Sequence, residues 1–517
     1  MAEKQANYEE LLLVKSLGHL TDDEALEHIG TLIDLAGMRD DRDGLDAALA
    51  LAKEMEHRQQ SDSTRATLQY FIGNAWANIV QVEMDEVSFG GWESEGREKS
   101  ILYYRRAMRD AGFTALTPER RCQILTNLGN QLSGIGRPIE AIEYWDQALT
   151  HVASFPMARG NRGQGLCHLA RMVDNRAQML LILRSAEPEI AATISSQIYP
   201  EARATFERYQ TWLREMLATP DSTVTPMTEQ EQLGDSDEER RYRRWCLNER
   251  LFLNPTNDLG ALPSAAWDSL VTPSLVTPIG VGPRHVGVFN QLKQEFVSAR
   301  YLLYESTRGG GSHFSDRRVV LYNTLDYPSY SLDTEKLRLA FRSAYSLLDK
   351  MTFFLNWYLG WQIPERGIYF KTCWYANQNR KAGPRSDLIN RENWPLRGLF
   401  WLSKDLFEDR ADFRDSMEPE AQSLYELRNQ LEHKYLKLHD MWLNHSPGDP
   451  FHDALAHSLK RSDFEAKTLR LFKIVRAAMM YLVFAMRQEE ADRENQRPAG
   501  GIIPPIWLDV YEDEWKS

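Results

Sequence analysis

The amino-acid sequence predicts an all-α protein in two parts, a solenoid of helical hairpins followed by a helical bundle with large insertions. The first 219 residues divide into helices separated by short breaks. Residues 220–240 interrupt this pattern with prolines, serines, threonines and a run of acids, as a linker does. Beyond them, apolar residues recur at steps of three and four, which is the spacing of one helix face. We therefore expect domains at 1–219 and 241–517.

The composition is that of a globular protein. The chain has 517 residues, of which 43% are hydrophobic and 11% aromatic, so it can bury cores without staples. Its four cysteines show no paired spacing, and neither a zinc site nor a disulfide framework is indicated. No run of about 18 apolar residues occurs, which predicts a cytoplasmic protein without a membrane partner. Because the net charge is −13, any RNA must bind at a local basic patch.

Residues 123–155 carry the most regular pattern of the N-terminal part. The positions concerned are Leu125, Leu128, Gly129, Leu132, Ala141, Trp145 and Ala148. They match the tetratricopeptide template, in which small residues let two antiparallel helices touch and large ones fill the groove. A looser copy has Gly73 on its first helix and Tyr104 on its second. This resemblance implies a solenoid that binds a protein or peptide trigger in its concave face. A passive spacer or dimerisation arm is the alternative.

The C-terminal part is predicted to have four core helices, at about 334–360, 396–406, 418–443 and 463–487. Pro419 suits the first turn of the third helix, because its missing donor is not needed there. The apolar stripe of that helix comprises Leu424, Leu427, Leu431, Tyr435, Leu438 and Trp442. We expect this stripe to face the core along the whole helix.

The third of these helices contains Arg428, Asn429 and, five residues after the arginine, His433. Histidine titrates near neutrality, and arginine binds phosphate through a planar fork of donors that stays charged. The pattern Arg-Asn-x-x-x-His in a helical domain resembles the signature of the HEPN superfamily of nucleotide-binding domains and ribonucleases. The resemblance implies metal-independent RNA cleavage without a cofactor. His433 would then handle a proton, while Arg428 and Asn429 hold the scissile phosphate for in-line attack by the 2′-hydroxyl.

A five-residue step is about 140° of rotation on an ideal helix, which places His433 opposite the leucine stripe. In the family, sites are commonly completed across a homodimer, where an outward histidine would meet its counterpart. The alternative is that His433 is a solvated surface residue and that the aliphatic part of Arg428 lies along the stripe. Asp349, on the first core helix, is a candidate for orienting His433, with a solvent-facing charge as the alternative.

We expect RNA to contact residues 369–397, where the chain locally reverses its charge. The basic residues proposed for this role are Lys371, Arg380, Lys381, Arg385 and Arg391. Trp374, Tyr375 and Trp394 lie among them and would stack on bases.

Two other functions are compatible with the sequence. The HEPN-like domain can be a non-catalytic scaffold that binds a nucleotide or a protein. His439-Asp440, His445, His452-Asp453 and His457 instead suggest a metal-dependent phosphohydrolase, although their spacing fits no metal template. The favoured prediction is an endoribonuclease of the bacterial toxin or antiviral defence type, controlled by the solenoid.

Overall fold

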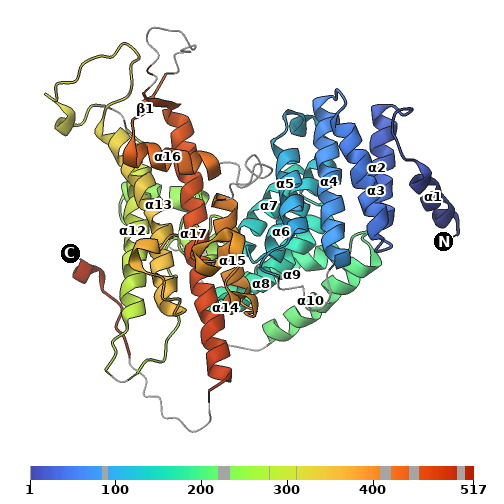
Figure 1. Ribbon diagram of the computed structural model, residues 1–517. Coiled ribbons are helices and arrows are strands. Elements are labelled where there is room, and N and C mark those ends of the chain that lie inside the picture. Colours follow the sequence, from blue (N-terminus) through green and yellow to red (C-terminus); the bar gives the residue numbers. More distant parts are fainter. Residues whose placement is uncertain are drawn as a thin grey trace.

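The computed structural model describes residues 2–83, 91–218, 233–278, 280–309, 311–407, 421–441, 453, 455–497 and 507–516. In these residues 17 α-helices and one two-stranded sheet are present, as the all-α prediction requires. Figure 1 shows an N-terminal solenoid beside a C-terminal bundle. Among the described helices, none is both long enough and apolar enough to span a membrane.

The solenoid consists of ten helices, most of them in antiparallel pairs. They are α1 (Ala2–Leu13), α2 (Asp22–Gly37), α3 (Arg42–Glu56), α4 (Asp62–Glu83), α5 (Glu95–Arg109), α6 (Pro118–Gly134), α7 (Pro138–His151), α8 (Pro156–Met172), α9 (Arg176–Ile194) and α10 (Pro200–Ala218). Side-chain caps set several starts: the Thr117 hydroxyl accepts the N–H of Arg120 at α6, next to Pro118.

The two sequence-matched hairpins pair as expected, α4 with α5 and α6 with α7. A Cβ on Gly129 would lie 2.6 Å from the Trp145 ring, and one on Gly73 would lie 2.7 Å from the Tyr104 ring. Only glycine therefore permits each helix to approach so closely. These contacts agree with the small-to-large template, while the tetratricopeptide assignment itself stays a prediction.

The C-terminal bundle is built on α12 (Arg284–Ser306), α13 (Leu332–Tyr358), α15 (Trp394–Phe407), α16 (Ala421–His433) and α17 (Arg461–Asn495). Three predicted core helices agree with α13, α15 and α17 apart from their ends. The predicted core omitted α12, which packs along α13. Smaller elements are α11 (Asp237–Asn248), α14 (Ser386–Ile389), β1 (Leu436–His439), β2 (His457–Lys460) and the 3₁₀ helices η3 (Pro255–Leu259) and η5 (Phe314–Asp316).

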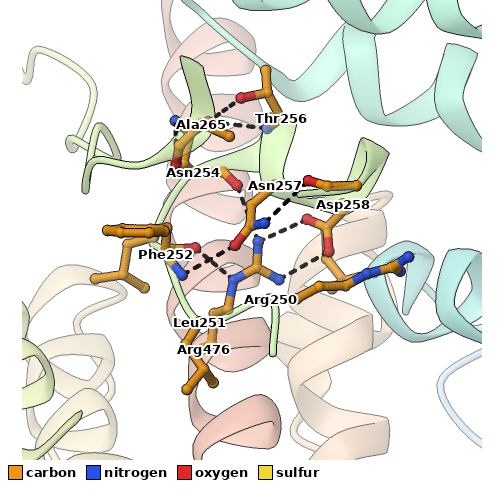
Figure 2. A network of polar contacts seen from close by, with 12 residues as sticks. Arg250, Leu251, Phe252, Asn254, Thr256, Asn257, Asp258, Ala265 and Arg476 are labelled. Carbon is orange, nitrogen blue, oxygen red and sulfur yellow. Dashed lines mark hydrogen bonds and ion pairs between the residues drawn. The ribbon is translucent and has the colours of Figure 1, made fainter. Parts of the chain in front are cut away.

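Two arginines of the bundle bind an irregular segment that precedes α12. Arg476 of α17 donates to the carbonyl oxygens of Phe252 and Asn254 and binds both carboxylate oxygens of Asp258 at 2.9 and 2.8 Å (Figure 2). Arg300 of α12 binds both oxygens of Asp268 in the same way. Bidentate pairing offsets the free-energy cost of burying these charges. Because one arginine comes from α12 and the other from α17, the segment connects the two helices.

The two parts of the molecule share one continuous apolar core. Asp405 of α15 accepts hydrogen bonds from Arg105 of α5 at 2.5 and 2.9 Å and from Arg137 at 2.5 Å. Next to it, Lys404 pairs with Glu98 of α5. All five side chains are buried. The solenoid is therefore packed onto the bundle through buried charges, although most of the predicted linker at 220–240 lies outside the described residues.

Candidate functional site

Helix α16 carries the sequence motif and faces the core through Leu424, Leu427 and Leu431, which are buried. The helix ends at His433, not near 443 as predicted. The chain then enters β1, which pairs in parallel with β2. Pro419 and Trp442 lie outside the described residues. The prediction failed because Leu436 and Leu438 satisfy a two-residue strand period as well as Leu431 and Leu438 satisfy a helical one.

Two arginines of α13 hold the C-terminal end of the motif helix and the start of β1. Arg342 donates to the carbonyl oxygen of Leu431, and Arg338 donates to that of Leu436 at 2.8 Å. The last carbonyl groups of a helix have no partner within it, and cations at this end also interact favourably with the helix dipole. The sequence analysis missed both residues, although their four-residue spacing places them on one face of α13.

Arg428 lies toward α13, half-buried, with its guanidinium carbon 5.9 Å from the centre of the Tyr345 ring. It donates a 3.2 Å hydrogen bond to the side-chain oxygen of Asn429. Asp349 is close enough for the charge of Arg428 to affect it. Burial raises the pKa of the Asp349 carboxyl, while a hydrogen bond from the N–H of Phe370 and the charge of Arg428 lower it. The charge of Arg428 therefore acts on Asp349, although the two side chains form no ion pair or hydrogen bond among the described contacts.

His433 lies on the exposed side of the last turn of α16, as the five-residue step predicts. Within the described residues its ring has no hydrogen bond or ion pair. Asp349 thus does not contact His433: the helix rotation that turns Arg428 toward α13 turns His433 away from it. The structure brings together Arg428, Asn429 and Asp349, and it presents His433 separately to solvent.

The basic stretch from 369 to 397 is only partly available to a ligand. Trp374 and Tyr375 are 0% and 2% exposed, so they cannot stack on bases as predicted. Trp394 is partly buried at the solenoid, where its ring centre lies 5.5 Å from that of His168. Sequence alone does not distinguish these core aromatics from exposed ones, because both occur among polar residues in irregular chain.

The proposed RNA-binding cations occupy different environments. Arg391 pairs with Glu489 at 2.5 Å, and Arg385 pairs with Asp387 at 3.1 Å. Arg380 lies over the Tyr375 ring, and Lys381 is exposed. Lys371 is nearest to the motif, with its amine 5.9 Å from the centre of the Tyr425 ring on α16. Tyr425 precedes Arg428 by one helical turn, so Lys371 extends the positive region of the motif.

Residues 277–489 match the family model described as LA2681-like HEPN. Residues 277–489 form an LA2681-like HEPN domain. The match begins just before α12 and ends within α17, so it includes α12, the motif helix and both strands of the sheet. No curated protein and no solved structure gives a significant match to the chain.

The structure describes only some residues of the histidine–aspartate pairs beyond the motif. Lys437 is 2.9 Å from Asp453, and Arg461 is 3.9 Å from Asp440. The described residues contain no group of three or more His, Cys, Asp or Glu side chains placed to hold a metal ion. His445 and His452 lie outside the described residues.

A cavity of about 1840 Å³ lies between helices of the solenoid and the HEPN domain. Asn161 and Gln164 of α8 line one wall, and Arg397 and Arg487 line the other. Burial and the nearby charge of Arg97 lower the pKa of Arg397 to about 10. The size exceeds the usual range for small-molecule pockets, about 300–1,000 Å³. This cleft has space for a segment of another chain.

Proposed function

We propose that the protein is an endoribonuclease that cleaves RNA without a metal ion. The observation that carries the proposal is the position of the motif on α16 of the HEPN domain. Arg428 and Asn429 lie together within electrostatic range of Asp349, and His433 faces solvent about 1.4 turns further on. HEPN domains often bind RNA and dimerise.

In this proposal the 2′-hydroxyl of a nucleotide attacks the adjacent phosphorus atom. The hydroxyl loses its proton as the new P–O bond forms, and the 5′-oxygen gains a proton as its bond to phosphorus breaks. His433 is the proton carrier of the motif. Arg428 and Asn429 donate hydrogen bonds to the phosphate oxygens, where negative charge increases in the transition state. The products are a 2′,3′-cyclic phosphate and a 5′-hydroxyl.

Lys371 gives the site a second cation for the RNA backbone. Its amine lies on the Tyr425 side of α16, one turn before Arg428. We assign Asp349 to the positioning of Arg428 rather than of His433, because the carboxylate lies beside the arginine. The Phe370 N–H holds the carboxylate at 3.0 Å, so its negative charge has a fixed position from which it attracts the guanidinium.

The test is incubation of the purified full-length protein with RNA in EDTA, followed by analysis of the fragment ends. We expect 2′,3′-cyclic phosphates, and His433→Ala should lower the rate by about 10² to 10⁴-fold. His57, an exposed histidine that follows α3, provides the matched control, because His57→Ala should cleave normally. Cleavage that requires a divalent ion and leaves 5′-phosphates would contradict the proposal.

A non-catalytic nucleotide- or protein-binding scaffold is the second candidate. It is favoured by the separation of His433 from Arg428 within one chain. Binding of RNA that depends on Arg428, with no cleavage under any condition, would support the scaffold.

We further propose that a protein or peptide trigger binds in the cleft between the solenoid and the HEPN domain. Such a partner would touch both walls and so connect recognition to the site, as expected of a defence or toxin protein. Asn161→Arg and Gln164→Arg each place a long cationic side chain in the cleft. In cells they should change Arg428-dependent toxicity, while the purified proteins cleave RNA at the wild-type rate. Gln147→Arg, at an exposed residue outside the cleft, is the control. Unchanged toxicity in both cleft variants would exclude this trigger site.

A further inference from the structure

The segment between η5 and α13 presents an unusual apolar surface. Val319, Val320, Leu321 and Tyr322 are adjacent in sequence and are 56%, 78%, 57% and 86% exposed. Single exposed apolar residues are normal on a protein surface, but contiguous ones mark interaction sites. Figure 1 shows this segment extending beyond the end of the helical bundle at which β1 lies.

The backbone polar groups of residues 319–324 are also unpaired among the described residues. These N–H and C=O groups make no hydrogen bonds to other described residues. The run Val-Val-Leu-Tyr has high β-propensity and contains neither proline nor charge. Natural proteins usually protect such edges with charges, bulges or a covering element. This segment has the properties of an unpaired strand.

The segment is held at its C-terminal end next to the small sheet. Asp326 forms a buried ion pair of 2.5 Å with Lys437 of β1. The N–H of Ser329 donates to the carbonyl oxygen of Leu438 at 2.7 Å. These contacts place the segment on the same side of the domain as β1, which begins three residues after His433. Anything that binds residues 319–324 therefore lies at the end of the HEPN domain that carries the motif histidine.

We propose that residues 319–324 pair antiparallel with the same residues of a second copy of the chain and so form a homodimer. An antiparallel strand is self-complementary across a two-fold axis, because each residue faces an equivalent position in the other copy. The four apolar side chains and their neighbour Tyr327 expose on the order of 1,000 Å² in the two copies together, and pairing would bring those of the strand into cross-strand contact. Only the catalytic consequence of this dimer rests on the proposed ribonuclease function.

Charge gives the proposed dimer a distinct dependence on salt. Each copy carries a net charge of −13, so two copies repel each other at low ionic strength. The pairing surface itself is uncharged between Val319 and Thr324. Screening should therefore strengthen the dimer as salt is raised, whereas an acidic partner or RNA bound at Arg317 and Arg318 would be released.

Sedimentation of the full-length protein over a wide concentration range tests the pairing. We expect the wild type to dimerise and Val320→Lys to weaken the dimer at least about tenfold, since a lysine on an edge strand opposes pairing. The Val320 side chain is exposed, so folding should be preserved, as near-ultraviolet circular dichroism can verify. Val271→Lys, at a residue 55% exposed before α12, should leave the dimer unchanged.

The outcomes separate this inference from the proposed function. A wild-type monomer at all concentrations and salt conditions, or a Val320→Lys dimer as tight as the wild type, overturns the strand pairing even if RNA is cleaved. Loss of the dimer in Val320→Lys, with Val271→Lys unaffected, supports the pairing even if neither protein cleaves RNA. If the wild type cleaves RNA and Val320→Lys loses this activity with its dimer, the two copies also act together in the reaction.

Discussion

At the scale of single residues, Arg428 and His433 of the candidate site lie in different environments. Arg428 is half-buried beside Tyr345 and Asp349, and His433 is exposed at the helix end. A phosphate bound at Arg428 would place a second negative charge near the Asp349 carboxylate. Because burial raises the pKa of Asp349, its negative charge is costly, and a phosphate that neutralises Arg428 would raise that pKa further.

Replacing Asp349 by asparagine separates positioning from stability. The amide oxygen can still accept the Phe370 N–H, so the melting temperature should be unchanged or slightly higher at neutral pH. A carboxyl group whose folded pKa is raised disfavours folding once it ionises, whereas the amide introduced by Asp349→Asn never ionises. We expect RNA cleavage to fall by up to about 10²-fold, because Arg428 loses the nearby negative charge that helps to position it.

A double-variant cycle checks this assignment. The variants Asp349→Asn and Arg428→Ala should not have additive effects on the cleavage rate, since both act through the same guanidinium. Additive losses would show that Asp349 acts on another group, such as His433.

At the scale of secondary-structure elements, periodic apolar patterns predicted the long helices, but they did not predict where α16 ends and β1 begins. The stripe on α13 and the apolar length of α17 are strong helical patterns. The ends of α13 lie within a few residues of the prediction, and α17 extends about two turns beyond its predicted end. The end of α16 was missed because Leu436 and Leu438 fit two periods. What decides between them is β2, whose residues pair with residues of β1 that lie 21 positions earlier in the chain, a contact that local pattern does not reveal.

The motif was recognisable because its pattern is local, whereas the sequence did not show which residues of the basic stretch 369–397 are accessible. Trp374 and Arg391 differ in their availability only through partners from other elements, as the pair of Arg391 with Glu489 of α17 illustrates. The exposed strand-like segment 319–324 is the opposite case. Its apolar run gives the sequence signature of a buried strand, and only the structure places it at the surface.

At the scale of the whole molecule, the solenoid and the HEPN domain are joined by buried charges. Removal of residues 1–219 would leave Asp405 without Arg105 and Arg137 and would expose Lys404. A chain without residues 1–219 therefore tests whether the HEPN domain folds, and not whether the solenoid controls its activity. The glycine at 136, with φ +90°, brings its loop against the backbone of α15 near Gly398, where a Cβ would collide. A trigger in the cleft would act on a closely packed pair and not on a free arm.

Asp405 is the residue on which this junction can be tested. Burial would raise the pKa of its carboxyl, but the charges and hydrogen bonds of Arg105 and Arg137 hold that pKa well below its ordinary value. Removing one member of a buried ion network typically costs about 3–5 kcal/mol, because the remaining charges lose their compensation. Asp405→Asn should therefore lower the free energy of unfolding by about this amount at pH 7, measured by urea denaturation of the full chain.

The pH dependence follows from the direction of the shift. A carboxyl with a depressed folded pKa stabilises the protein above its unfolded pKa, about 3.9 for aspartate, and this contribution is lost progressively as the pH falls below that value. The stability difference between the wild type and Asp405→Asn should thus be full at pH 7 and shrink in acid. Asp46→Asn, which breaks the exposed pair of Asp46 with Arg42, should cost less than about 1 kcal/mol. If Asp405→Asn costs no more than Asp46→Asn, the buried charges do not hold the solenoid to the HEPN domain, and the apolar core alone must join them.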